Sequence, residues 1–181
     1  MSILSVYHQS SPDTPNKVLT HADDIAATLA EQGVRFEQLT PAERIRPGTE
    51  PAQVIAALGA QVEALGAGVV EVLSVHPEHG QKDEIRAGLI DERRHAGADL
   101  RFFVSGRGLL SLRIGEYVYA LMGERGDVVS VPAGTAQWFD IGEQPNLVLV
   151  RVFESEEGRK VELTGNELSR AFPTLEDTFL V

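Results

Sequence analysis

The chain contains no cysteine among its 181 residues. Disulfide bonds, thiolate metal sites and a cysteine nucleophile are therefore excluded. The sequence also lacks an apolar run approaching the roughly 18 residues that a membrane-spanning helix needs. Its first residues, MSILSVYHQSSP, do not combine a basic start with an apolar run, as a secretory signal would. These absences predict a cytoplasmic protein with no membrane partner.

Basic residues are scarce as well. The chain has 16 Lys and Arg against 27 Asp and Glu, a formal net charge of −11 at pH 7. Nucleic-acid binding depends on clustered basic side chains, so this balance argues against a nucleic-acid partner. The acidic residues are dispersed along the chain, which is typical of a solvated surface.

The first half of the chain predicts helices mixed with short strands. Residues 3–8, 34–39 and 69–75 have strand-like patterns. A helix is expected over 20–33, with Thr20 as its N-cap and Gly33 as its stop. A second helix is expected over 50–65, where Pro51 is allowed in the first turn. A third helical segment is expected over QKDEIRAGLIDERRH, residues 81–95.

From Leu100 onward the pattern changes to short β-rich runs separated by Gly or Pro turns. Six such runs are visible: LRFFVSG, GLLSLRIG, EYVYALMG, GDVVSVPAG, QWFDIG and NLVLVRVF. This spacing predicts a β-sandwich or small barrel, followed by a tail with a short helix capped by Thr164. The expected fold is α+β. We expect one domain over 1–181, in which 1–88 is mixed helix and strand, 89–153 forms the barrel and 154–181 is the tail.

Two stretches of the barrel region resemble the two motifs of the cupin superfamily. The first contains His95, Asp99 four residues later, and Gly106 seven after that; the second is GDVVSVPAGTAQW, which ends at Trp138. Residues two apart on a strand point to the same face, so such motifs can bring side chains from facing strands to one point. Imidazoles and a carboxylate with open positions suit Fe(II), Mn or Ni.

Longer blocks narrow the resemblance to the acireductone dioxygenase family. They are LSVYHxSSPxxPNKVLTHxxDIAxTLAEQGVRF at 4–36, RFFVxGRG at 101–108, VYA at 118–120, GDVVSVPAGT at 126–135 and WFDIGEQPN at 138–146. This resemblance implies a cupin barrel, a double-stranded β-helix, with N-terminal helices and extra strands. It also implies a small-molecule substrate, an enediol of the methionine salvage pathway, which the family cleaves with O2 using iron or nickel.

The ligands that the resemblance implies are where this chain departs from the family. The two-histidine pair falls on Arg93 and His95, the carboxylate, usually Glu, on Asp99, and the last histidine on Gln137. The remaining candidate metal ligands are thus His95, Asp99 and Gln137, because a guanidinium stays protonated and cannot ligate. At an effective dielectric constant near 20, a dication about 4 Å from Arg93 would be repelled by about 8 kcal/mol. We therefore expect Fe(II) or Ni(II) to bind weakly or not at all.

The resemblance also implies residues around the ligands. Arg101 falls where a residue holds the substrate anion, and His95, Asp99 and Arg101 are the candidate catalytic residues. Leu89 falls where the family usually has an aromatic. For the aromatic candidates the alternative role is barrel packing, and for the arginines it is a structural ion pair or an edge charge. The candidate substrate-binding residues are Arg93, Arg101, Trp138, Phe139, Arg151 and Leu89.

Three functions remain open on the sequence alone. The leading one is a diverged family member with an eroded metal site that binds or transforms a small anionic or enediol-like metabolite. The first alternative is an active metal-dependent acireductone dioxygenase that uses a reduced ligand set of His95, Asp99 and Gln137. The second is a non-catalytic cupin binding module. Whether the chain is an enzyme is thus left open, and a monomer or small homo-oligomer is expected.

Overall fold

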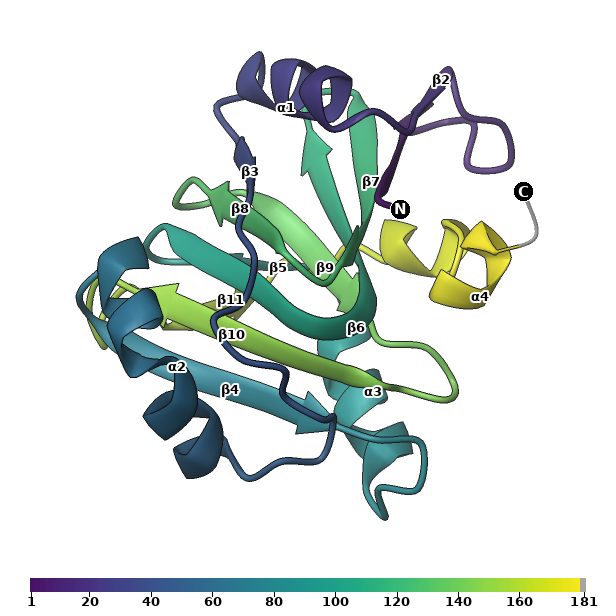
Figure 1. Cartoon of the computed structure of the whole chain (residues 1–181). Coiled ribbons are helices and arrows are strands. Elements are labelled where there is room, and N and C mark those ends of the chain that lie inside the picture. Colours follow the sequence, from purple (N-terminus) through teal and green to yellow (C-terminus); the bar gives the residue numbers. More distant parts are fainter. Residues whose placement is uncertain (180–181) are drawn as a thin grey trace.

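The computed structural model describes residues 1–179, in which the first half mixes helices with strands and seven strands then follow one another from residue 93 to 163 (Figure 1). In chain order they are β1 (Ile3–His8), β2 (Lys17–Leu19), α1 (Ala22–Ala30), β3 (Arg35–Gln38), α2 (Pro51–Leu65), β4 (Val69–Val75), α3 (Lys82–Ile90), β5 (Arg93–His95), β6 (Asp99–Ile114), β7 (Tyr117–Glu124), β8 (Asp127–Val131), β9 (Ala136–Asp140), β10 (Leu147–Phe153), β11 (Val161–Leu163), the 3-10 turn η1 (Leu168–Ala171) and α4 (Leu175–Thr178).

Strand β6 organises the sheet because four other strands pair with it. Its first half lies between β10 and β8, and its second half lies between β7 and β9. Gly106 marks the change with a φ of 76°, and a Cβ there would meet the carbonyl oxygen of Asn146 at 1.8 Å. Only glycine suits this bend, where the backbone is left-handed and a neighbouring strand approaches closely. One long strand thus serves both walls of the barrel.

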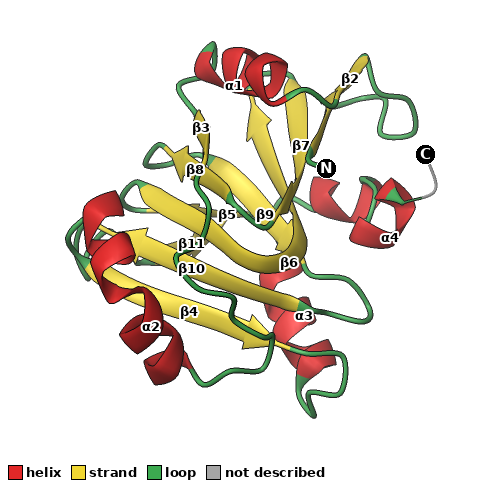
Figure 2. Ribbon diagram, in the orientation of Figure 1, coloured by secondary structure: helices red, strands yellow, loops and turns green. Residues whose placement is uncertain are grey.

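The interior of the barrel holds the largest apolar cluster, to which Phe103, Leu110, Phe139 and Leu149 belong. A second cluster lies on the outside of the wall, where Val54, Leu58 and Val62 of α2 cover β-strand residues such as Phe102 and Val150. Figure 2 shows the same arrangement, with the helices at the periphery of the strands. The predicted α+β fold, a barrel of antiparallel strands with N-terminal helices and extra strands, is confirmed, and β1, β3 and β4 of the N-terminal half pair with strands of the C-terminal half. No helix among residues 1–179 is long and apolar enough to cross a membrane.

The structure corrects two predicted elements of the N-terminal half. Helix α1 begins at Ala22 after His21, so Thr20 is not its N-cap. The helical segment predicted over 81–95 ends at Ile90, and Arg93–His95 is a strand instead. The reason is tertiary: β5 pairs with β9 on one side and β11 on the other, which overrides a local pattern that suits a helix.

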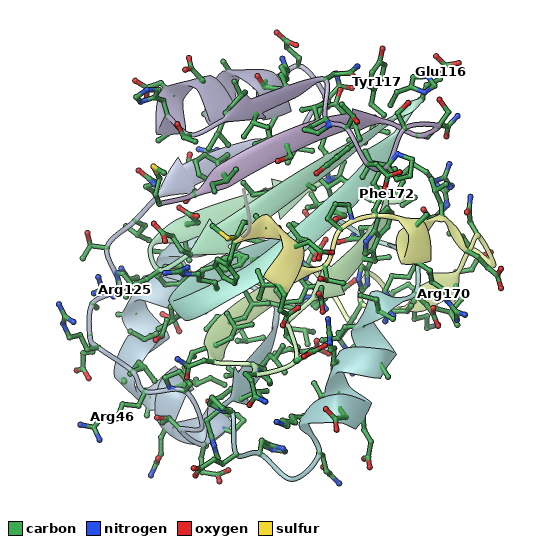
Figure 3. All side chains as sticks on the ribbon, turned by 90° about the vertical axis from the view of Figure 1, so that its right-hand side faces the viewer. Arg46, Glu116, Tyr117, Arg125, Arg170 and Phe172 are labelled. Carbon is green, nitrogen blue, oxygen red and sulfur yellow. The ribbon has the colours of Figure 1, made fainter. Side chains whose placement is uncertain are left out.

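The C-terminal half needs corrections as well. The runs LRFFVSG and GLLSLRIG form the single strand β6. In the tail, Thr164 does not cap a helix, and its hydroxyl donates to Glu92. The capped helix is α4, where Thr174 accepts from the Asp177 N–H and Asp177 accepts from the Thr174 N–H. Phe172, labelled in Figure 3, is buried beside Tyr7 and Trp138, which attaches the tail to the barrel.

Candidate functional site

Six polar side chains from four strands lie close together, and hydrogen bonds join five of them. Arg93 and His95 are two residues apart on β5, and Asp99 and Arg101 are two apart on β6, so each pair shares a face. Hydrogen bonding between neighbouring strands brings one further residue beside each of these two pairs. Gln137 of β9 is the partner of Arg93, and Arg151 of β10 is the partner of Arg101. The structure thus brings His95, Asp99, Arg101, Gln137 and Arg151 into hydrogen-bonding contact. The catalytic and binding roles expected of them stay predictions.

The guanidinium of Arg151 lies between His95 and Asp99. Its Nη2 is 2.8 Å from Asp99 Oδ2 and 3.0 Å from His95 Nε2. Because a guanidinium only donates, His95 Nε2 must accept, which leaves the ring proton on Nδ1. That Nδ1 is buried and has no hydrogen-bond partner.

Arg101 engages the other possible ligand atoms. Its Nε is 3.3 Å from Asp99 Oδ2, and its Nη2 donates to Gln137 Oε1 at 2.8 Å. The side chains of Asp99 and Arg101 are almost fully buried, with 0% and 3% exposure. Each of the three predicted metal ligands therefore accepts a hydrogen bond from a guanidinium.

This donor set does not fit a resident divalent metal. A cationic nitrogen already occupies the space between the imidazole and the carboxylate, and both positive charge and lost acceptor atoms oppose a second cation. Within residues 1–179, no three His, Asp or Glu side chains are grouped so that they could hold a metal ion. In this arrangement the three side chains that the family resemblance gave as ligands are already engaged by guanidinium groups.

The electrostatics of the site follow from burial and from the excess of arginine. Burial and the charge of Arg151 lower the pKa of His95 to about 4, so the imidazole is neutral at pH 7. Burial raises the pKa of Asp99, but Arg101 and Arg151 outweigh it and the net pKa lies below the ordinary value. Burial and Arg151 lower the pKa of Arg101 to about 9, which still leaves it charged at pH 7.

Arg93 borders the cluster and retains partial exposure to solvent. Its Nε donates to the Asp91 carbonyl at 3.1 Å, and its Nη2 donates to the Gly88 carbonyl at 2.6 Å. Burial and the nearby Arg151 lower its pKa. Two backbone carbonyls at the end of α3 thus hold this arginine, and neither contact was predicted from the residue pattern.

The aromatic candidates separate onto opposite faces of β9. Phe139 faces the barrel interior, and the guanidinium carbon of Arg101 lies 5.0 Å from its ring centre. Leu89 packs against the same interior cluster. Trp138 points the other way and packs with Phe172, so its position does not support the substrate-binding role predicted for it. The alternation of a strand requires this separation of neighbouring residues.

One aromatic residue of the site, Phe153, was not predicted from the sequence. Phe153 lies two residues after Arg151, with its ring centre 4.8 Å from the guanidinium carbon and 5.4 Å from the centre of the His95 ring. The signal that could have found it is the period of two along β10. A ring face attracts a guanidinium, so Phe153 and Phe139 each support one arginine.

Comparisons with known proteins place the chain in a family. The ARD/ARD' family model matches residues 6–160. The chain belongs to the acireductone dioxygenase family. Two acireductone dioxygenases of Pseudomonas fluorescens, from strains Pf-5 and Pf0-1, are 54% and 50% identical over 181 residues, which cover 98% of this chain and 100% of each relative.

A solved structure supports the fold. The acireductone dioxygenase from Bacillus anthracis superposes with a TM-score of 0.73 at 19% identity, covering 90% of this chain and 98% of that one. That protein was solved with a cadmium ion in its active centre. The names of the relatives favour an active metal-dependent dioxygenase. The contacts of the site side chains favour a diverged member whose metal site is eroded.

Proposed function

We propose that this member of the acireductone dioxygenase family binds a small anionic or enediol-like metabolite in its barrel without a resident metal. The observation that carries the proposal is the position of Arg151 between His95 and Asp99. In that place a guanidinium supplies positive charge and hydrogen-bond donors, which are the features that an enolate or carboxylate oxygen needs.

The charges of the cluster support an anionic ligand. Arg101 and Arg151 share one carboxylate, Asp99, and Arg93 adds a third positive charge at the border of the cluster, where Asp91 is the carboxylate near it. A buried excess of positive charge is costly unless an anion compensates it. The Nε of Arg151 is a buried donor without a partner, so a hydrogen-bonding group remains available to a ligand.

The site is better suited to holding an anion than to removing a proton. A general base works best when its pKa lies near the working pH. The pKa of His95 is about 4 and that of Asp99 lies below its ordinary value. Both groups are therefore weak bases at pH 7, and the binding role is more strongly supported than metal-free acid/base catalysis.

Calorimetry with a stable enediol tests this proposal. Ascorbate and acetate are titrated into chelator-treated protein under nitrogen, with the variant Arg151→Met and the control Arg94→Gln. Arg94 neighbours Arg93 but is exposed on the opposite face of β5. Loss of a charge-assisted hydrogen bond should weaken ascorbate binding roughly tenfold or more in Arg151→Met and leave Arg94→Gln unchanged. No binding to the wild type, or equal binding in all three proteins, would overturn the proposal.

A second candidate is the metal-dependent dioxygenase reaction, which the identity of 54% over the whole chain favours. It requires Arg151 and Arg101 to leave the oxygen and nitrogen atoms that they now engage, so that His95, Asp99 and Gln137 can face a metal. Oxygen consumption with an acireductone and added Fe(II) decides between the two. Turnover that disappears in His95→Ala supports this candidate, and a rate equal to that of buffer rejects it.

A further inference from the structure

The segment from residue 161 to 179 lies beyond the part of the chain that the family model matches, which ends at residue 160. It nevertheless contacts the strand that carries Arg93 and His95. In β11, Val161 pairs with His95 and Leu163 pairs with Arg93. The strand of the site is thus held on one edge by β9 and on the other by this segment.

Two further contacts attach the segment to the chain just before β5. The Thr164 hydroxyl donates to Glu92 Oε1 at 2.7 Å, and the Thr164 N–H donates to the Glu92 carbonyl at 3.1 Å. Glu92 is 1% exposed, and the bond to it is therefore part of the interior. Arg170 adds a longer, exposed contact of 3.4 Å with Asp91.

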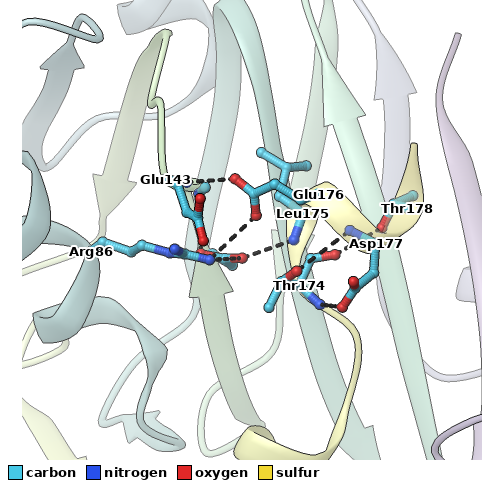
Figure 4. A network of polar contacts seen from close by, with 9 residues as sticks. Arg86, Glu143, Thr174, Leu175, Glu176, Asp177 and Thr178 are labelled. Atoms are coloured by element: carbon cyan, nitrogen blue, oxygen red, sulfur yellow. Dashed lines mark hydrogen bonds and ion pairs between the residues drawn. The ribbon is translucent and has the colours of Figure 1, made fainter. Parts of the chain in front are cut away.

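The same segment also holds α3, through Arg86 (Figure 4). Arg86 binds Asp140 with two hydrogen bonds of 2.7 and 3.1 Å and reaches Glu176 of α4 at 3.3 Å. Asp140 in turn accepts from the Leu175 N–H at 2.8 Å. One arginine therefore connects α3, the end of β9 and α4.

Helix α3 is the element that holds Arg93. The carbonyl of Gly88, near its end, accepts from Arg93 Nη2, and Asp91 follows the helix. His95, Asp99, Arg101 and Gln137 are at most 3% exposed, whereas Arg93 is partly exposed and the side chain of Arg151 is 12% exposed. A ligand would meet these two arginines first, beside the wall that α3 and β5 form.

We propose that residues 161–179 act as a brace that sets the position of α3 and β5, and that Arg86 is a positioning residue for Arg93 and His95. Arg86 contacts no group of the site itself and acts through α3 and β9. Thr164 acts in the same way through Glu92. This inference concerns the shape of the site and holds for whichever ligand the site takes.

Hydrogen exchange measured by mass spectrometry on the full-length protein tests the brace. The variants are Arg86→Gln, its conservative partner Arg86→Lys, and Thr164→Val, which removes the hydroxyl while keeping the shape. Arg35→Gln is the control, because it breaks an exposed ion pair with Glu37 on β3. We expect residues 82–95 to exchange at least several-fold faster in Arg86→Gln and Thr164→Val, less so in Arg86→Lys, while residues 109–124 exchange as in the wild type.

An NMR signal from His95 shows whether the variants move the site residues or only destabilise the fold in general. With ¹⁵N-labelled histidine, the ring nitrogens of His95 report the hydrogen bond from Arg151 and the tautomer that it sets. These resonances should shift in Arg86→Gln and Thr164→Val and remain unchanged in Arg35→Gln. If Arg86→Gln does not fold, Thr164→Val decides. Unchanged exchange over 82–95, or a rise no larger than elsewhere in the chain, overturns the brace; anion binding is measured separately, so the proposed function could still stand.

Discussion

Two buried charged clusters of this protein lie near β5, and they are balanced differently. Glu92 accepts two hydrogen bonds of 2.8 Å from Arg113 and one of 2.7 Å from Thr164, so one carboxylate matches one guanidinium. In the other cluster Asp99 is the carboxylate for Arg101 and Arg151, with Arg93 nearby. A matched pair can be explained by folding alone. An unmatched excess of positive charge is costly without a compensating anion, and this difference supports the proposed anion-binding role of the second cluster.

The largest effect on stability is expected in the matched cluster. Glu92→Ala leaves Arg113 without its partner and removes the acceptor of Thr164. Because Arg113 is 20% exposed, water recovers part of the loss, and we expect the free energy of unfolding to fall by about 3 kcal/mol. Urea unfolding measures this change. A loss below about 1 kcal/mol, which is typical of a surface ion pair, would mean that the Glu92–Arg113 pair does not stabilise the fold more than the Asp99 cluster does.

The stability that the Glu92–Arg113 pair contributes should depend on pH. Burial raises the pKa of Glu92, but Arg113 and Thr164 outweigh it, so the folded-state pKa lies below 4.5. A lowered folded pKa contributes stability that is fully present above the unfolded value and is lost as the pH falls through the folded value. The difference in unfolding free energy between wild type and Glu92→Gln should therefore shrink as the pH falls below 4.5. A constant difference between about pH 7 and pH 3 would contradict this.

Much of this arrangement follows from residue patterns, and part of it does not. The period of two along β6 is enough to place Asp99 with Arg101. The same rule separates Trp138 from Phe139, although the family resemblance had grouped them. The placement of Arg93 with His95 followed from the family resemblance, because the local pattern of 81–95 suits a helix. The position of the Arg151 guanidinium depends on competition among buried groups that no pattern encodes. The pairing of β11 with β5 is non-local and was equally invisible in the sequence.

A smaller effect on stability is expected in the unmatched cluster. Arg151→Met removes one of two guanidiniums that bind Asp99, and Arg101 remains to pair with it. The loss of a hydrogen bond is offset by relief of the repulsion among the arginines, and Met can still pack on Phe153. We expect the unfolding free energy to change by about 1 kcal/mol or less. A loss as large as that of Glu92→Ala in the same urea series would make Arg151 a structural residue.

The smallest effect is expected on the outer face of β5. Arg94 is exposed and donates to the Gly134 carbonyl at 2.8 Å. Arg94→Gln should change stability by about 0.5 kcal/mol or less, as surface substitutions usually do. The same urea series checks it. A larger change would show that the exposed face of β5, which carries Arg94, also contributes to stability.

The metal content of the purified protein decides whether the site holds a resident metal. The chain and its relative from Pseudomonas fluorescens Pf-5 are produced side by side in cells supplemented with iron and nickel, and bound metals are measured by mass spectrometry. Because guanidinium groups occupy the three possible ligands, we predict far less than one metal ion per chain in this protein and a filled site in the relative. Iron or nickel held at close to one ion per chain, and lost in His95→Ala, would show that the site holds a metal after all and would favour the dioxygenase reaction.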